Sequence, residues 1–313
     1  MKKYGFGADV GGTTIKMGLF EMDGTLVEKW EIPTDTTEKG AHILQDIAAT
    51  VHGKMVENDL TKDMVEGIGI GVPGAVDKDG VVNRAVNLGW DIVPLAEELG
   101  RLSGMKVKVG NDANVAALGE NWMGSGKGYN SIVMVTLGTG IGGGIIIDGN
   151  ILTGANGAAG EIGHIVVNEQ EIEACNCGHY GCIEQYASAT GIVRMAKRAL
   201  AGTSEDSKLR TFGDAVSAKD VFDCARAGDK VACDVVDQVC GMLGATLAKI
   251  GCVVNPDAFI IGGGVSRAGQ ILIDALQEPF KAQVFHACKD TPIVLATLGN
   301  DAGIYGAVCM LLS

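Results

Sequence analysis

The sequence has no long run of apolar residues. Its apolar stretches, such as "SIVMV" and "GIII", fall well short of the roughly 18 residues that a membrane-spanning helix requires. The first residues, "MKKYGFGADVGG", also lack the apolar core and the cleavage site of a secretory signal. We therefore expect a soluble protein of the cytoplasm.

Positive charge is scarce. The chain has 25 Lys and Arg residues against 38 Asp and Glu residues, which gives a net charge of −13. Nucleic acids and anionic membranes are polyanions that bind through Lys and Arg, so this charge disfavours both as partners. An anionic ligand would have to be bound by local groups.

The sequence also lacks a Pro-, Ser- or Gly-rich linker, although 313 residues favour two domains. A pattern of strand, glycine turn, strand and hairpin occurs in "FGADVGGTTIKMGLFEMDGTLVEKW" and again in "IVMVTLGTGIGGGIIIDGNILTG", which indicates an internal duplication. Short buried strands alternate with helical segments, as in α/β proteins. We expect a small α/β domain over residues 1–118, a larger one over 119–299, a cleft between them, and a C-terminal helix (300–313) on the first.

Two glycine turns, in "ADVGGTTIK" and "TLGTGIGG", are candidate phosphate-binding sites. Neither contains the GKS or GKT of a P loop, and neither matches GxGxxG followed by the acidic ribose ligand of a dinucleotide site. Each offers backbone N–H groups and threonine hydroxyls that can bind phosphate, and the carboxylate in the first can hold Mg²⁺ beside a phosphate. Alternatively, each is only a hairpin turn that needs glycine. The candidate residues are Asp9, Gly11, Gly12 and Thr13 in the first turn, and Thr136, Gly138, Thr139 and Gly140 in the second.

A third glycine group follows the apolar strand "AFII" and precedes a helix. Glycines at such a position can let the backbone approach a flat nucleotide. The residues are Gly262, Gly263 and Gly264.

Asn111 and Asp112 stand between the strand "KVKV" and a helix. Aspartate here is a good helix N cap. It is equally suited to accept the proton of a substrate hydroxyl as that hydroxyl attacks phosphorus, with Asn111 orienting a sugar. The residues alone leave both interpretations open.

Three of the nine cysteines are clustered in "CNCGHYGCIE". Cys175, Cys177 and Cys182, with one imidazole, would complete a tetrahedral zinc shell, and proximity in sequence nominates His179 as the fourth ligand. A redox-sensitive pair is the weaker alternative. Four protein ligands would make the zinc structural, whereas an open position with Glu184 as base would make a hydrolase. The other six cysteines are predicted to be small buried residues.

Seven motifs carry a family resemblance, and together they cover residues 4–310. In order, they are "DVGGTTIK", "GVPGAVD", "NDANVAALGE", "TLGTGIGGG", "GAAGEIGH", "CNCGHYGCIEQYAS" and "IIGGGVS". They resemble the ROK family (repressors, unassigned reading frames and sugar kinases), and most closely its bacterial glucokinases. The resemblance implies the actin-like ATPase fold, which is the hexokinase-type, ribonuclease H-like fold, with two α/β domains around a cleft.

The resemblance also implies roles for single residues. It makes Asp112 the catalytic base, assigns both glycine turns to phosphate and residues 262–264 to the adenosine side, and makes His164 the fourth zinc ligand in place of His179. Many members carry lysine where this chain has Thr14, so no phosphate-binding lysine is assigned at that position. Lys16, two residues later, lies on the same strand face, and its role stays open. The implied sugar contacts are Asn111, Asp112, Glu161, His164 and Glu184.

The resemblance therefore implies an ATP-dependent glucokinase that phosphorylates the 6-hydroxyl of glucose, with Mg²⁺, a structural Zn²⁺ and a homodimeric assembly. A ROK kinase for fructose, mannose or N-acetylmannosamine is the alternative. A sugar-responsive repressor is disfavoured because the phosphate turn begins at Asp9, which leaves no room before it for a DNA-binding domain.

Overall fold

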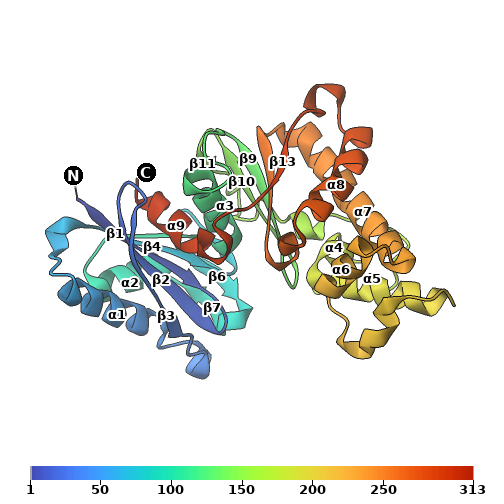
Figure 1. Cartoon of the computed structure of the whole chain (residues 1–313). Coiled ribbons are helices and arrows are strands. Elements are labelled where there is room, and N and C mark those ends of the chain that lie inside the picture. The colour runs from blue at the N-terminus through green and yellow to red at the C-terminus, as the bar shows by residue number, and fades with distance from the viewer. Residues whose placement is uncertain (1, 313) are drawn as a thin grey trace. The chain divides into compact units, whose positions relative to one another are not determined.

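The computed structural model describes residues 2–312, which divide into two compact units (Figure 1). Unit 1 contains residues 2–130, 144–160 and 297–312, and unit 2 contains residues 131–143 and 161–296. The chain therefore passes between the units four times. The domain boundary near residue 118 stays a prediction.

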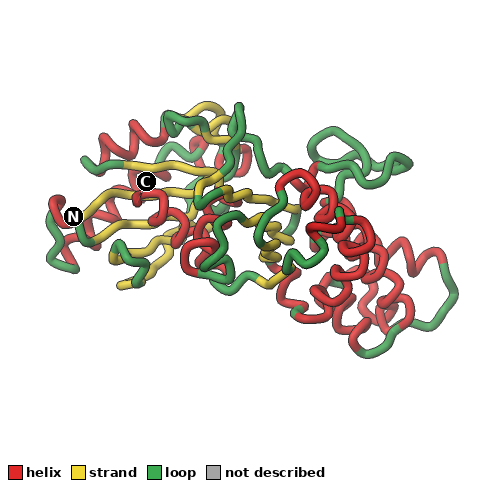
Figure 2. Tube along the Cα trace, turned by 90° about the horizontal axis from the view of Figure 1, so that it is seen from above, coloured by secondary structure: helices red, strands yellow, loops and turns green. Residues whose placement is uncertain are grey.

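A five-stranded sheet forms the centre of unit 1, and its strands run side by side in Figure 2. The strand order is β3-β2-β1-β4-β8; β2 is antiparallel to both of its neighbours, β1 and β3, whereas β4 is parallel to both β1 and β8. The strands are β1 (Tyr4–Val10), β2 (Thr14–Glu21), β3 (Leu26–Pro33), β4 (Val65–Val72) and β8 (Val107–Asn111).

The second sheet repeats the order of the first, as β11-β10-β9-β12-β13. Its strand β12 is parallel to both β9 and β13, as β4 is parallel to β1 and β8. The internal duplication predicted from the sequence is confirmed by this match. The strands are β9 (Ile132–Leu137), β10 (Ile141–Ile147), β11 (Asn150–Ile151), β12 (Ala258–Gly262) and β13 (Ile293–Leu295).

One face of the unit 1 sheet is covered by α1 (Ile43–Glu57) and α2 (Leu95–Ser103). Ile47, Val51 and Leu99 from these helices are fully buried in one cluster with strand residues such as Phe6 and Ile15. Burying each such side chain contributes about 1.5–3 kcal/mol. Neither α2 nor the small sheet β5-β6-β7 was predicted; its strands are β5 (Ala75–Val76), β6 (Val82–Ala85) and β7 (Trp90–Val93).

The other face packs against α9 (Ala302–Cys309) through glycines. A Cβ atom on Gly69 of β4 would lie 1.7 Å from the carbonyl oxygen of Ala307, and one on Gly306 would lie 1.7 Å from that of Val115 in α3 (Asp112–Met123). Neither position has room for a side chain. Glycine therefore allows α9 to pack backbone to backbone against both β4 and α3.

Helices dominate the later part of unit 2, where they lie against one another (red in Figure 2). Side-chain caps begin three of them: Ser188 caps α5, Ser217 caps α6 in a capping box, and Asp229 caps α7. The helices are α4 (Glu184–Ala187), α5 (Ala189–Gly202), α6 (Ala218–Arg226), α7 (Lys230–Val254) and α8 (Gln270–Gln283).

Within residues 2–312, α7 is the one helix that is long and apolar enough to cross a membrane. Its most apolar 18-residue window has a mean hydropathy of 1.4, but 61% of that window is buried inside the protein. A core helix meets the same criteria of length and composition. We therefore take α7 as the core helix of unit 2.

Candidate active site and metal centre

Asp9 lies near the end of β1, where it faces Lys16 of β2 across the antiparallel pair. The carboxyl group is partly buried, and its pKa is raised to about 6, mainly by this burial; the nearby Lys16 opposes the rise and Asp112 adds to it. A Cβ atom on Gly303 would lie 2.6 Å from Cγ of Asp9, so the first turn of α9 packs on the carboxyl group. Unit 1 thus holds two interacting carboxylates in one region.

The glycine turn of unit 1 follows β1 at residues 11–13, which are exposed. The hydroxyl of Thr34 donates a hydrogen bond of 2.7 Å to the carbonyl oxygen of Gly11. A Cβ atom on Gly12 would lie 3.7 Å from Cβ of Asn87, so Asn87 stands beside the turn. Asn87 had no recognisable signal in the sequence, because it reaches this position through the short 3₁₀ helix (Val86–Leu88) between β6 and β7.

Asn111, and not Asp112, is the N cap of α3. Its side-chain oxygen accepts hydrogen bonds from the backbone N–H groups of Ala113 (3.1 Å) and Asn114 (3.2 Å), and its side-chain nitrogen donates to the carbonyl oxygen of Gly74 (3.1 Å). Asp112 is the first helical residue, and its Oδ1 accepts from the N–H of Ala113 (2.8 Å). The interpretation of Asp112 as the helix cap is therefore wrong.

The glycine turn of unit 2 lies between β9 and β10, at residues 138–140. The hydroxyl of Thr190, at the start of α5, donates to the carbonyl oxygen of Thr139 (2.7 Å). A Cβ atom on Gly140 would lie 2.7 Å from Oε2 of Glu184. Glycine at 140 therefore lets Glu184 lie directly against the turn, and Thr190 is a neighbour of the turn that the sequence did not reveal.

The third glycine group lies beside the same end of β9, because Gly262 is the register partner of Thr136. Gly263 has a φ of 82°, and a Cβ atom there would lie 2.5 Å from the carbonyl oxygen of Leu137. Both the backbone conformation and the close approach require glycine at this position. Gly264 then opens a short 3₁₀ helix. Unit 2 thus gathers the second and third glycine groups at one edge of its sheet.

Three predicted sugar contacts come together around His164 in unit 2. Its Nε2 lies 3.8 Å from the carboxylate of Glu161, and its Nδ1 lies 3.8 Å from Oε1 of Glu184. Oε1 of Glu184 is also 3.0 Å from Sγ of Cys175. His164 therefore presents one ring nitrogen to Glu161 and the other to Glu184 and the cysteines.

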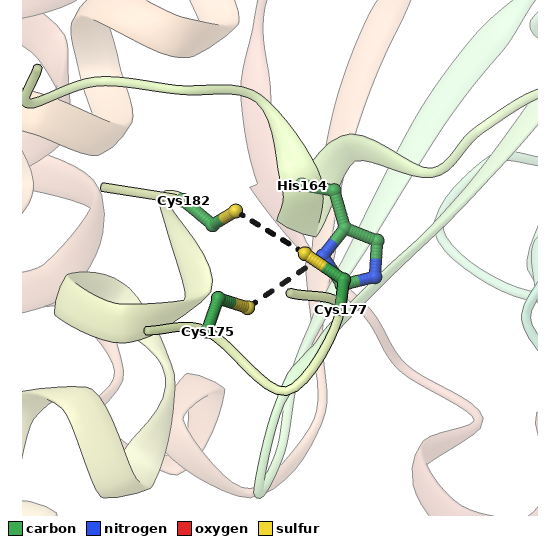
Figure 3. A group of neighbouring side chains, drawn as sticks. All are labelled: His164, Cys175, Cys177 and Cys182. Carbon is green, nitrogen blue, oxygen red and sulfur yellow. Dashed lines mark hydrogen bonds between the residues drawn. The ribbon is translucent and has the colours of Figure 1, made fainter. Parts of the chain in front are cut away.

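The imidazole of His164 and the thiols of Cys175, Cys177 and Cys182 form one cluster (Figure 3). One ligand atom from each lies within 4.8 Å of all the others. His179 is exposed and lies outside this group, although its Nδ1 is 3.8 Å from Sγ of Cys177. Its backbone carbonyl oxygen instead accepts a hydrogen bond from the N–H of Cys175 (2.7 Å), which closes the loop.

The spacing of the cluster fits a zinc ion. Tetrahedral zinc with Zn–S bonds of about 2.3 Å holds two sulfurs about 3.8 Å apart. Sγ of Cys177 lies 3.6 Å from Sγ of Cys182, and Sγ of Cys175 lies 3.9 Å from Nδ1 of His164. Three thiols and one imidazole are also a donor set that zinc prefers. Of the two histidines considered from the sequence, the cluster includes His164.

The duplicated sheets, their glycine turns and the Cys₃His loop together indicate a sugar kinase of the duplicated α/β class. The family model described as "ROK family" matches residues 5–313, and the chain belongs to this family. The predicted family is confirmed, and so is the predicted fold class, because the ROK sugar kinases have the actin-like ATPase fold.

The similar proteins include two curated glucokinases and one solved structure. The chain is 44% identical to the glucokinase of Halalkalibacterium halodurans over 96% of this chain and 92% of the relative. It is 39% identical to the glucokinase of Thermotoga maritima over 97% and 96% of the two chains. A ROK family glucokinase from Streptomyces griseus, in complex with glucose and AMPPNP, has a TM-score of 0.78 and 36% identity, with 98% of both chains covered.

Proposed function

We propose that this protein is an ATP-dependent glucokinase, which transfers the γ-phosphoryl group of ATP to the 6-hydroxyl of glucose. The observation that carries the proposal is the likeness along nearly the whole chain to glucokinases at 44% and 39% identity. The Streptomyces griseus structure adds that a ROK relative holds glucose together with an ATP analogue. Glucose is favoured over fructose, mannose and N-acetylmannosamine on this ground.

In unit 1 we assign Asp112 as the general base. Phosphoryl transfer requires a group that accepts the proton of the attacking hydroxyl, and an aspartate at the start of a helix, after a strand, is positioned for this task. We assign Asn111 as its neighbouring sugar ligand, with the side chain held by the cap of α3 and by Gly74. The hydrogen bonds of the Asn111 side chain would restrain the backbone at residue 111 and so help to orient the neighbouring Asp112.

Asp9 and the turn after it would bind the phosphate end of the nucleotide. Mg²⁺ bound with ATP supplies neutralisation of the phosphate charge, and Asp9 is the carboxylate that would hold it. Burial and Asp112 raise the pKa of Asp9 while Lys16 lowers it, which supports a site where a further positive charge would be stabilised. A cation would therefore be attracted to this site. The donors of the turn are Gly11, Gly12 and Thr13.

In unit 2 we assign the turn at Thr136, Gly138, Thr139 and Gly140 to phosphate and residues 262–264 to the adenosine side. We assign Glu161, His164 and Glu184 to the sugar hydroxyls, because carboxylates and an imidazole nitrogen accept hydrogen bonds from them. The position of His164 between the carboxylates of Glu161 and Glu184 supports the assignment.

We propose that His164, Cys175, Cys177 and Cys182 hold a structural zinc ion. Four protein donors complete a tetrahedral shell and leave no position for a reactive water, which argues against a zinc hydrolase. The ion would stabilise the loop that leads into Glu184. We further propose, from the family resemblance, that the protein works in the cytoplasm as a homodimer.

A coupled kinase assay tests the proposed function. Glucose, fructose, mannose and N-acetylmannosamine are compared as acceptors, with ATP, ADP and polyphosphate as donors. We expect the highest kcat/KM for glucose with ATP. A higher kcat/KM for another hexose would overturn the substrate assignment, and no phosphorylation of any sugar would overturn the kinase. Elemental analysis should find one zinc per chain, and light scattering should find twice the monomer mass.

A further inference from the structure

Glu171 is a buried carboxylate to which neither the zinc site nor the sugar site has given a role. Its side chain is only 2% exposed, and it lies in the loop that leads to the first cysteine of the cluster. The carboxylate accepts six hydrogen bonds, all between 2.6 and 3.1 Å. The donors are the backbone N–H groups of Ile172 and Glu173, the hydroxyl of Tyr186, and the guanidinium groups of Arg194 and Arg198.

These contacts keep Glu171 ionised. The hydrogen bonds from Arg198 hold the pKa of Glu171 well below its usual range, against the opposing effect of burial. Arg198 makes two bonds, of 2.9 and 3.0 Å, and Arg194 makes one of 3.0 Å while its guanidinium stacks over the ring of Tyr186 at 5.3 Å. Charge-assisted bonds of this kind are about twice as strong as neutral ones. The carboxylate of Glu171 therefore binds Tyr186, Arg194 and Arg198 strongly, and we call these four side chains the Glu171 junction.

The junction joins the two chain segments that carry the site. Glu171 stands four residues before Cys175, whereas Tyr186 stands in α4 two residues after Glu184. The carboxylate of Glu184 touches both Sγ of Cys175 (3.0 Å) and the N–H of Ile141 (3.4 Å). The hydrogen bond from Tyr186 to Glu171 therefore ties α4, the helix that carries Glu184, to the segment that leads to Cys175.

Arg194 brings the same junction to the edge of the site. A cavity of about 360 Å³ in unit 2 is lined by Arg194 together with Thr139, Gly140, Cys175 and Glu184. The two arginines both stand in α5, so the helix that begins beside the glycine turn is itself bonded to Glu171. A displacement of α5 would therefore also displace Glu171 and, through Tyr186, the helix α4 that carries Glu184.

We propose that Glu171 is a positioning residue for Glu184, acting through Tyr186 and α5 as a second anchor beside the zinc ion. Its role differs from that of the ion because the six hydrogen bonds involve no atom of the Cys₃His cluster. The inference rests on the proposed function insofar as Glu184 binds the sugar.

The test replaces Glu171 by Gln in the zinc-loaded protein. Gln has a similar shape but turns an acceptor into a donor that faces two guanidinium groups. We expect the KM for glucose to rise about tenfold, as a loss of about 1.4 kcal/mol of binding would produce. The kcat and the KM for ATP should stay within about twofold, and the zinc content should be unchanged. Hydrogen exchange at residues 184–187 should be faster.

Glu173→Gln is the matched control. Glu173 binds the same two arginines at 3.0 and 2.8 Å, but its side chain is 56% exposed. We expect the glucose KM of this variant to change by less than twofold, because exposed ion pairs contribute little. Tyr186→Phe removes one link only and should raise the glucose KM in the same direction, so it tests the inference should Glu171→Gln not fold.

An unchanged glucose KM and unchanged exchange at residues 184–187 in both Glu171→Gln and Tyr186→Phe would overturn the inference. Equal effects of Glu171→Gln and Glu173→Gln would overturn it as well. Failure of the wild-type protein to phosphorylate glucose would instead overturn the proposed function, and hydrogen exchange would still decide whether Glu171 holds α4.

Discussion

Sγ of Cys175 lies 3.0 Å from Oε1 of Glu184, so the metal cluster and the proposed sugar ligand are in direct contact. Cys175 and Glu184 are nine residues apart, and the loop between them folds back through the bonds of Cys175 and Gly178. A group that fixes the sulfur also fixes one side of the carboxylate. The cluster and the sugar site should therefore respond together when the metal is removed.

The first prediction concerns the metal. Cys177→Ser removes one of four ligands, and we expect the variant to lose its zinc. We also expect glucose to bind at least about tenfold more weakly, a loss of about 1.4 kcal/mol, because the loop that holds Glu184 is released. Elemental analysis and isothermal titration with glucose measure the two effects. Cys233→Ser, outside the cluster, should change neither; full glucose affinity in a zinc-free protein would contradict the prediction.

The second prediction concerns the base. Asp112→Asn keeps the shape of the side chain but cannot accept a proton, so kcat should fall by about 10²–10⁴. Glucose affinity should stay within a few-fold of the wild type, as titration calorimetry would show. Asp46→Asn is the control, because Asp46 is also an aspartate in the first turn of a helix in unit 1. Near-normal turnover of Asp112→Asn would exclude Asp112 as the base.

The third prediction concerns Asp9 and pH. Its pKa is raised from the ordinary 3.8 to about 6, so between these values the folded protein binds a proton that the unfolded chain does not. The free energy of unfolding from this group therefore falls as pH rises through that window. Asp9→Asn should unfold at a higher temperature than the wild type above pH 6, with a difference that shrinks toward pH 4, and should lose activity.

Asp23 supplies the control of opposite sign. Hydrogen bonds from Thr25 lower the pKa of Asp23, so this exposed carboxylate stabilises the fold as pH rises. Asp23→Asn should give no gain in melting temperature at neutral pH. Calorimetry of both variants between pH 4 and pH 8 measures the difference. Equal melting temperatures for Asp9→Asn and the wild type at pH 8 would contradict the assignment for Asp9.

The fourth prediction concerns the packing of α9. Gly306→Ala places a methyl group 1.7 Å from the carbonyl oxygen of Val115, and we expect a loss of at least about 1–3 kcal/mol in the free energy of unfolding. Gly241→Ala, inside α7, meets nothing within 4 Å and should gain about 0.5–1 kcal/mol from the lower entropy of the unfolded chain. Urea denaturation distinguishes the two; a tolerated Gly306→Ala would show that α9 can move away.

The sequence revealed those parts of the fold that repeat or have local signals. The duplicated glycine turns predicted two similar sheets, and both have the same strand order. The strands of the small sheet β5-β6-β7 were missed because they have two to four residues and are stabilised by pairing rather than by local pattern, and the nine-residue helix α2 that follows them was missed with them. Short elements of this kind are determined by contacts that are distant in sequence.

The site shows the same limit. Spacing alone nominated His179, whereas the cluster contains His164, which stands eleven residues before Cys175. Asn111 is the N cap of α3 because the helix begins at Asp112, one residue earlier than a cap at Asp112 would require. Glu171 had no recognisable signal in the sequence, since the side chains that bind it stand 15 to 27 residues away. Motifs identify the residues of the site, and only the folded chain shows which neighbours hold them.

The position of α9 has a consequence for the order of folding during synthesis. Strands β1 and β4 lie within the first 72 residues, yet the helix that covers their glycine face is made only at residues 302–309. When the ribosome has synthesised all of unit 2, it has therefore not yet synthesised the last part of unit 1. The residues of unit 2 end at 296, so the packing of unit 1 is completed only after every residue of unit 2 has been made, although unit 1 begins first. A shortened messenger that omits the final helix would leave the apolar glycine face of the first sheet open to aggregation.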